Sequence, residues 1–141
     1  MSGESASVLI IDDEPQIRKF LRISLVSQGY RVVEGVDGRD GLTRAALERP
    51  DLVVLDLGLP DMDGQVVLSE LRGWSQVPVI VLSVRSSEAE KVRALDAGAN
   101  DYVTKPFGIQ EFLARVRGLL RQSTVSASTT AQVVAGALCI D

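Results

Sequence analysis

Short apolar runs alternate with segments of helical periodicity over the first 122 residues of the chain. The runs have the length of β-strands and are bounded by turn-forming residues. The third run is apolar at almost every position, as expected for a strand that is buried on both faces of a sheet. The pattern predicts strands over Val8–Asp12, Arg31–Val36, Leu52–Leu57, Val77–Ser83 and Tyr102–Lys105.

The segments between the strands have apolar residues at the three- and four-residue spacing of amphipathic helices. Strands that alternate with helices of this length imply right-handed crossovers, and therefore a doubly wound parallel α/β sheet with helices on both faces. In the first helix we expect a broad apolar stripe to face the core, formed by Ile17, Phe20, Leu21, Ile23, Leu25 and Val26. The predicted helices span Pro15–Gln28, Gly38–Glu48, Gln65–Arg72, Ser86–Gly98 and Ile109–Gln122.

The composition changes after Arg121, where small polar residues replace the helical pattern. We therefore divide the chain into a folded domain over residues 1–122 and a flexible linker over residues 123–132. Residues 133–141 are apolar again, and we interpret them as the start of a second domain that is otherwise missing.

Charge and composition exclude several classes of function. The net charge of -4 argues against direct binding of nucleic acid, because phosphate contacts need clustered Lys and Arg. The chain has no histidine, which excludes Ser-His-Asp and Cys-His catalysis and histidine-ligated metals. A single cysteine fits a reducing compartment, and no apolar stretch approaches the ~18 residues of a membrane span. We expect an acidic, cytoplasmic protein without membrane contact.

Four of the apolar runs end on residues with chemically active side chains: Asp12 with Asp13, then Asp56, Ser83 and Lys105. The carboxyl ends of parallel strands lie at one edge of the sheet, which is where open α/β folds bind ligands. Three carboxylates, a hydroxyl and an ammonium group are therefore expected in one pocket. This set of groups suits a divalent cation and a phosphoryl group.

The three carboxylates form a candidate Mg²⁺ site, since Mg²⁺ prefers carboxylate and carbonyl oxygens. Without a cation, two carboxylates ~4 Å apart repel by about 4 kcal/mol at an effective dielectric constant of 20. This cost argues against a purely structural role for the cluster. Asp56 is also a candidate nucleophile toward phosphorus, with Lys105 as the neutralising cation. Its X–Pro bond, Lys105-Pro106, is a candidate cis peptide.

Each residue also has a structural interpretation when it is taken alone. Asp13 could cap the first helix, because Pro15 suits a first helical turn. Ser83 could cap a helix, and Lys105 could be a solvated surface lysine.

Four motifs, in this order and at this spacing, resemble the receiver domain of bacterial two-component response regulators over residues 7–122. They are Ile11–Glu14, Leu55–Gly64, Ser83 and Tyr102–Phe107. The resemblance implies a (βα)5 flavodoxin-like, CheY-like domain whose five parallel strands have the order 2-1-3-4-5. It also implies a sensor histidine kinase as the partner that donates the phosphoryl group.

The resemblance assigns a role to each residue of the pocket. Asp56 is implied to be the phosphoacceptor, and Lys105 to pair with its acyl phosphate. Asp13, Asp56 and the Gly58 carbonyl are implied to bind Mg²⁺, while Asp12 acts mainly through water.

Two further residues are implied to form a switch. Ser83 would move to hydrogen-bond the phosphoryl group, and Tyr102 would then turn inward. Alternatively, Tyr102 is an ordinary half-buried strand tyrosine.

The segment Asp101–Phe107, with Glu111 and Arg115, resembles the OmpR/PhoB class of transcription factors. In that class the fourth helix, fifth strand and fifth helix form a two-fold dimer face. The resemblance implies that Lys91 meets Glu111 of the partner and that Asp101 meets Arg115 of the partner. Ordinary helix-surface charge is the alternative, and Asn100 and Gly118 depart from the class.

The same class implies DNA binding, but only through a missing C-terminal domain. Residues 133–141 resemble the first strand of its winged-helix domain. The segments 57–61 and 74–83 resemble those of regulators of a potassium-uptake system, which implies control of potassium-transport genes.

Two other functions remain as alternatives. Phosphatases of the haloacid-dehalogenase type have a general acid two positions after the nucleophile, but that position is Gly58 here. A receiver-like scaffold would need an unphosphorylatable Asp56. We expect no enzyme activity beyond the protein's own phosphotransfer and a slow self-dephosphorylation, because Arg85 could shield the phosphoryl group and Val84 could narrow access to it.

Overall fold

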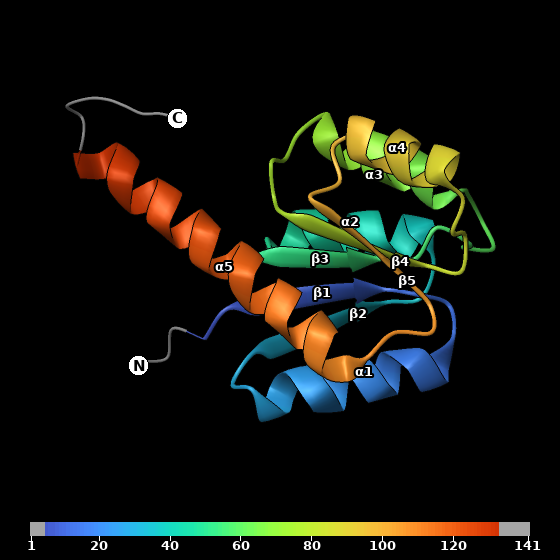
Figure 1. Cartoon of the computed structure of the whole chain (residues 1–141), viewed down its shortest axis with the longest axis horizontal. Helices are drawn as coiled ribbons and strands as arrows, with labels where there is room; N and C mark the ends of the chain where they lie inside the picture. Colours follow the sequence, from blue (N-terminus) through green and yellow to red (C-terminus); the bar gives the residue numbers. More distant parts are fainter. Residues whose placement is uncertain (1–4, 133–141) are drawn as a thin grey trace.

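A parallel sheet of five strands forms the centre of the molecule, with the strand order β2-β1-β3-β4-β5 (Figure 1). This computed structural model describes residues 5–132, with side chains up to residue 121. The fold class and the strand order confirm the prediction. The strands are β1 (Ser7–Ile11), β2 (Arg31–Gly35), β3 (Leu52–Leu55), β4 (Val79–Ser83) and β5 (Asp101–Thr104).

Five helices cover the two faces of the sheet, as right-handed crossovers require. Helices α1 and α5 lie on one face, and α2, α3 and α4 lie on the other (Figure 1). Their bounds are α1 (Pro15–Ser27), α2 (Gly38–Glu48), α3 (Gly64–Arg72), α4 (Glu88–Asp96) and α5 (Ile109–Gln132).

The core has two halves, one on each side of the sheet, because successive strand residues point to opposite faces. In β1, Val8 and Ile10 pack in the cluster under α1 and α5. Leu9 and Ile11 pack in the cluster under α2, α3 and α4. Every residue of β1, β3 and β4 is buried, so helices cover these central strands on both faces of the sheet.

Helix caps fix the loops at the carboxyl edge of the sheet. Asp63 precedes α3, and its side chain accepts a hydrogen bond from the Gln65 N–H at 2.9 Å. Ser87 precedes α4, and its hydroxyl accepts one from the Glu90 N–H at 3.2 Å. Both side chains satisfy backbone donors that a helix start leaves free. The loops after β3 and β4 therefore end at defined positions.

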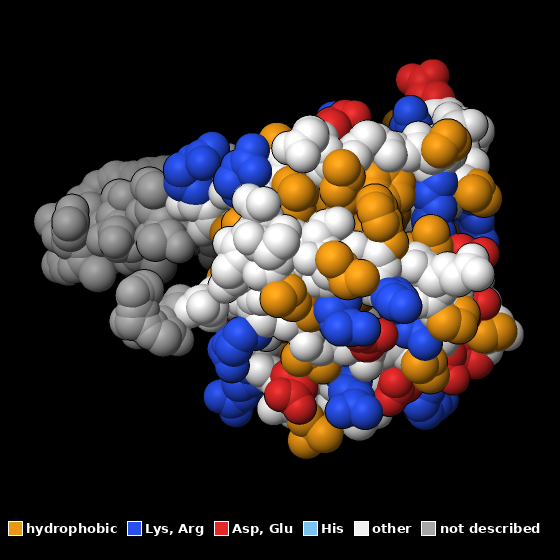
Figure 2. Space-filling model, turned by 90° about the horizontal axis from the view of Figure 1, so that it is seen from below, with side chains coloured by type: hydrophobic (Ala, Val, Ile, Leu, Met, Phe, Trp, Pro, Cys, Tyr) orange, Lys and Arg blue, Asp and Glu red, His pale blue; other side chains and the backbone are white. Residues whose placement is uncertain are grey.

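The apolar stripe predicted for α1 is narrower than expected. Leu21 and Leu25 are fully buried, but Phe20, Ile23 and Val26 are 46%, 55% and 53% exposed. The reason is that α1 lies against β1 and the edge strand β2, so only one side of the helix meets the sheet. On the face that carries α1, apolar side chains lie among charged ones (Figure 2).

The predicted end of the last helix was wrong, since α5 runs to Gln132 instead of ending at Gln122. The segment 123–132, predicted as a flexible linker, is helical. The division into domains stays a prediction, and its last part, residues 133–141, lies outside the described residues.

Within residues 5–132, no helix combines the length and the apolar character that crossing a membrane requires.

Gly64 allows the start of α3 to approach β3 closely. A Cβ there would lie 2.5 Å from the Leu57 Cα and 2.6 Å from the Asp56 carbonyl oxygen. These are backbone atoms, so Gly64→Ala should lower the free energy of unfolding by about 2–3 kcal/mol. A Cβ added at Gly118, in α5, would have no atom within 4 Å apart from its own helix backbone. Gly118→Ala should therefore raise the free energy of unfolding by about 1 kcal/mol. Urea denaturation measures both, and equal stability of Gly64→Ala and wild type would contradict the close approach.

Candidate functional site

Three carboxylates meet at the carboxyl edge of the sheet, as predicted. Asp12 follows β1 and Asp56 follows β3, and these strands are neighbours, with Asp56 N–H donating to the Ile11 carbonyl at 3.0 Å. One carboxylate oxygen each from Asp12, Asp13 and Asp56 lie within 4.8 Å of one another. Asp12 and Asp56 are buried, while Asp13 is exposed. Adjacent parallel strands thus bring together acids that are 44 residues apart.

Lys105 lies inside this cluster, which argues against a solvated surface lysine. Its Nζ is 3.3 Å from Asp12 Oδ2, 3.7 Å from Asp56 Oδ1 and 3.9 Å from Glu14 Oε1. The side chain is 13% exposed. The Lys105-Pro106 peptide bond is cis, as the sequence suggested. One ammonium group therefore faces the carboxylates of the pocket.

The negative charge in the pocket is only partly compensated. Burial, and then the neighbouring Asp12 carboxylate, raise the pKa of Asp56 above its usual value. Lys105 and a hydrogen bond from the Gly58 N–H, at 3.3 Å from Asp56 Oδ1, act in the opposite direction. The net increase shows that ionised Asp56 is disfavoured in this environment and would gain from a further positive charge.

The donor set fits a hard divalent cation such as Mg²⁺, because it offers carboxylate oxygens and no sulfur or nitrogen ligand. Asp13 has an exposed carboxylate, free to bind. Asp12 differs, since its Oδ1 accepts a hydrogen bond from the Glu14 N–H at 2.9 Å and its Oδ2 faces Lys105. The indirect role of Asp12, through water, stays a prediction. Gly58 is exposed beside Asp56, at the position expected to offer a carbonyl.

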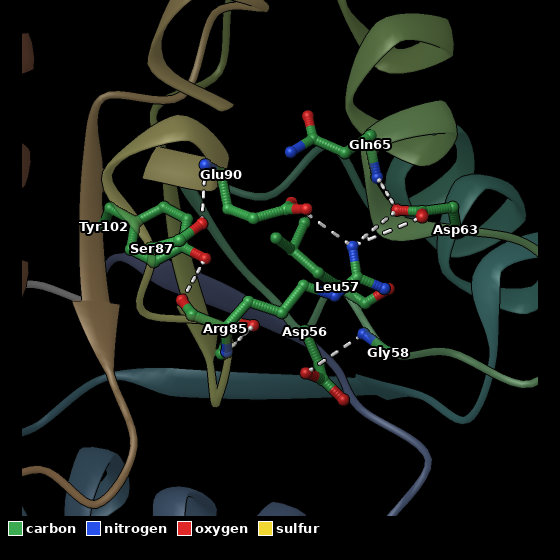
Figure 3. A network of polar contacts seen from close by, with 10 residues as sticks. Asp56, Leu57, Gly58, Asp63, Gln65, Arg85, Ser87, Glu90 and Tyr102 are labelled. Atoms are coloured by element: carbon green, nitrogen blue, oxygen red, sulfur yellow. Dashed lines mark hydrogen bonds and ion pairs between the residues drawn. The ribbon is translucent and has the colours of Figure 1, made fainter. Parts of the chain in front are cut away.

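Ser83 and Tyr102, the predicted switch residues, are joined through the backbone of Arg85. Ser83 ends β4, is 1% exposed, and its Oγ accepts a hydrogen bond from the Arg85 N–H at 3.0 Å. The Tyr102 hydroxyl donates to the Arg85 carbonyl at 2.6 Å (Figure 3). Tyr102 is half-buried against the core under α2, α3 and α4. The two side chains therefore hold the consecutive peptide units on either side of the Arg85 Cα.

The Arg85 side chain spans the space between the loop after β3 and the start of α4 (Figure 3). Its guanidinium lies 3.3 Å from the Asp63 carboxylate, 3.3 Å from the Leu57 carbonyl oxygen and 3.6 Å from Glu90 Oε1. The Arg85 guanidinium is thus engaged with groups other than the Asp56 carboxylate, and its role as a shield of the phosphoryl group stays a prediction. Sequence reasoning missed this network, although the cap pattern before each helix could have indicated Asp63 as a partner.

The residues predicted for the dimer face lie on α4, β5 and α5. Arg115 forms ion pairs within its own chain, at 2.8 Å to Asp101 Oδ2 and 2.8 Å to Glu111 Oε2. Lys91 forms no ion pair with another described residue within 4.0 Å. The single chain thus already contains a version of one predicted pair, and the contacts between chains stay a prediction.

Known proteins share this sequence pattern. Residues 8–117 match the family model of the response regulator receiver domain. The chain is 56% identical over 127 residues to the transcriptional regulatory protein KdpE of Mycobacterium tuberculosis, covering 90% of this chain and 56% of that protein. It is 54% identical over 120 residues to the KDP operon transcriptional regulatory protein KdpE of Escherichia coli, covering 85% and 53%. The chain spans about half the length of these curated relatives.

A solved structure shares the fold as well. The receiver domain of the Francisella response regulator 1452 superposes with a TM-score of 0.81 at 32% identity, covering 84% of this chain and 99% of that one. The family match, the identity to these regulators and the acidic edge of a 2-1-3-4-5 sheet agree with one another. The chain belongs to the family of response regulator receiver domains.

Proposed function

We propose that this chain is a phosphorylation-activated receiver domain in which Asp56 accepts a phosphoryl group from a sensor histidine kinase. The observation that carries this proposal is the convergence of Asp12, Asp13 and Lys105 on the buried Asp56 carboxylate. A bound Mg²⁺ would supply charge neutralisation for the transfer. Asp13, Asp56 and the Gly58 carbonyl are the proposed ligands, with Asp12 acting through water.

The two oxygens of Asp56 are not equivalent. Oδ1 accepts the hydrogen bond from Gly58 and faces Lys105, whereas Oδ2 forms no hydrogen bond with a described residue. Oδ2 is thus the oxygen free to attack phosphorus: the new O–P bond forms as the N–P bond to the kinase histidine breaks. Lys105 is near enough to neutralise the product, as phosphoryl transfer requires.

The phosphorylated state would act through the switch residues. Ser83 would leave the Arg85 N–H to bind the phosphoryl group, and Tyr102 would respond through its own bond to Arg85. A ligand shifts an equilibrium only by binding one conformation better, and the phosphoryl group supplies that difference. We propose that the changed face of α4, β5 and α5 forms a homodimer through Lys91, Asp101, Glu111 and Arg115.

The whole protein is proposed to be a cytoplasmic OmpR/PhoB-class regulator that binds DNA through a C-terminal domain and controls potassium-transport genes. The identity to two KdpE proteins supports this proposal. A phosphatase acting on external substrates is less well supported, because Gly58 provides no general acid. A scaffold is less well supported because no pocket residue is missing. We propose no catalysis beyond self-phosphorylation and slow self-dephosphorylation.

Intact mass after incubation with acetyl phosphate tests the central proposal. With Mg²⁺, wild type should gain one alkali-labile phosphoryl group, and Asp56→Asn should gain none. Omission of Mg²⁺ should abolish the gain, since the carboxylate cluster then lacks its counter-charge. An unmodified wild type in the presence of Mg²⁺ would favour the scaffold.

The raised pKa of Asp56 predicts that its charge destabilises the metal-free fold at neutral pH. When the pKa of a carboxyl is higher in the folded than in the unfolded state, the free energy of unfolding falls as the pH rises through the folded-state pKa. Asp56→Asn should therefore raise the Tm at pH 7 in EDTA by about 3 °C. Mg²⁺ should stabilise only wild type and reduce this difference.

Asp61→Asn provides a control of opposite sign for this measurement. The N–H groups of Arg39 and Gly38 donate to the Asp61 carboxylate and hold its pKa below the usual value. Its charge is thus favourable above that pKa, and its removal should lower the Tm at pH 7. Calorimetry that finds the same sign for both variants would contradict the electrostatic account.

The dimer proposal predicts a charge-reversal effect in the phosphorylated chain. Lys91→Glu would place like charges opposite Glu111 of the partner and should weaken dimerisation about fivefold, whereas Lys91→Glu with Glu111→Lys should restore it. Lys19→Glu, on the exposed side of α1, is the matched control. Sedimentation equilibrium measures the constants, and equal values for the two single variants would exclude this face.

A further inference from the structure

We propose that Arg18 of α1 is a positioning residue for the cation site: its guanidinium fixes the peptide unit between Asp12 and Asp13, and so aims the Asp13 carboxylate. This inference rests on the proposed function, because it concerns the cation that Asp13 and Asp56 would bind. Arg18 itself touches neither the cation site's carboxylates nor the phosphoacceptor among the contacts of the described residues.

Every polar group of Asp12 is held in place. Its N–H donates to the Gly35 carbonyl at 3.1 Å, which extends the pairing of β1 with β2 by one residue. Its carboxylate is held by the Glu14 N–H and Lys105. Its carbonyl oxygen accepts a hydrogen bond from Arg18 Nη1 at 2.7 Å, a charge-assisted contact.

Asp13 has no such support of its own. It is exposed, and no hydrogen bond or ion pair joins it to another residue in the described part of the chain. The peptide unit is planar, so the direction of the Asp12 carbonyl sets the orientation of the Asp13 N–H and Cα. Holding that carbonyl therefore limits where the Asp13 carboxylate can point.

Arg18 is well placed for this role because it is itself oriented. Its Nε donates to Glu34 Oε1 at 3.0 Å, and its side chain is only 14% exposed. Glu34 lies on β2 directly before Gly35, the residue that accepts from the Asp12 N–H. One segment of β2 thus fixes the peptide groups on both sides of the Asp12 Cα, one directly and one through Arg18.

Arg22, one turn further along α1, is a natural control. It binds the other oxygen of Glu34, with Nε 2.9 Å from Oε2, but its side chain is 47% exposed and it forms no hydrogen bond with Asp12. Arg18 and Arg22 therefore share residue type, helix and partner. They differ in that only Arg18 donates a hydrogen bond to the Asp12 carbonyl oxygen.

The sign of the effect separates positioning from simple electrostatics. Arg18 is positively charged, so Coulomb repulsion alone predicts that its removal strengthens the binding of a cation. Loss of a positioning contact predicts weaker binding, because the Asp13 ligand must then be ordered at the moment the cation binds. Partners that orient metal ligands commonly change metal affinity tenfold or more when they are removed.

The test is a titration of the 141-residue chain with Mn²⁺, in which electron paramagnetic resonance counts the free ion. Arg18→Met should weaken Mn²⁺ binding about tenfold, and Arg22→Met should change it less than twofold. Arg18→Lys keeps the charge but cannot make both contacts, and about threefold weaker binding is expected. Urea unfolding in EDTA establishes that each variant is folded.

The outcomes distinguish this proposal from the proposed function. Unchanged or tighter binding by Arg18→Met overturns the positioning role, as does equal weakening by Arg18→Met and Arg22→Met. Should Arg18→Met fail to fold, Arg18→Lys decides by the same comparison. A wild type that binds no Mn²⁺ overturns the cation site and this inference together, whereas binding by wild type that Arg18→Met leaves unaltered overturns only the inference.

Discussion

The repulsion among the carboxylates of Asp12, Asp13 and Asp56 is the constraint around which the structure is arranged. Nothing in the chain's local preferences holds these acids together. Burial, and then the neighbouring Asp12 carboxylate, raise the pKa of Asp56, so its ionised form is disfavoured at this position. The buried strands β1 and β3 provide the opposing force. Their apolar side chains pack on both faces of the sheet, so the acids that follow them have fixed positions. Burial of apolar area thereby maintains the charge arrangement on which the proposed function depends.

The sequence alone predicts much of this arrangement, because its central strands are almost purely apolar and each ends on a distinctive residue. Asp56 and Lys105 could be placed at one edge without knowledge of any contact, since parallel strands align their carboxyl ends. Helix limits were less predictable. The exposure of the Phe20 side chain depends on how far α1 overlaps the sheet. No Gly or Pro directly follows Gln122 to end α5 there, and the helix continues to Gln132.

Arginine contacts were the hardest features to predict. Arg85 and Arg18 each reach a backbone carbonyl and an acidic side chain on a different element. Long side chains have many rotamers, so sequence spacing does not determine their partners. Both residues nevertheless restrain loops beside the acidic cluster, one after β1 and the other after β3. The loops beside the acidic cluster are therefore held on the scaffold by arginine side chains as well as by packing.

The ion pair between Arg115 and Asp101 within one chain affects how a dimer of the proposed kind would be stabilised. If Arg115 exchanged this partner for Asp101 of a second copy, the number of pairs would be conserved, and the free energy of each bond would largely cancel between the two states. Association would then be an exchange of equivalent contacts, with the net stabilisation left to shape and apolar packing. The ion pairs of such a face would make dimerisation depend on the conformation of the chain, while contributing little to the free energy of association.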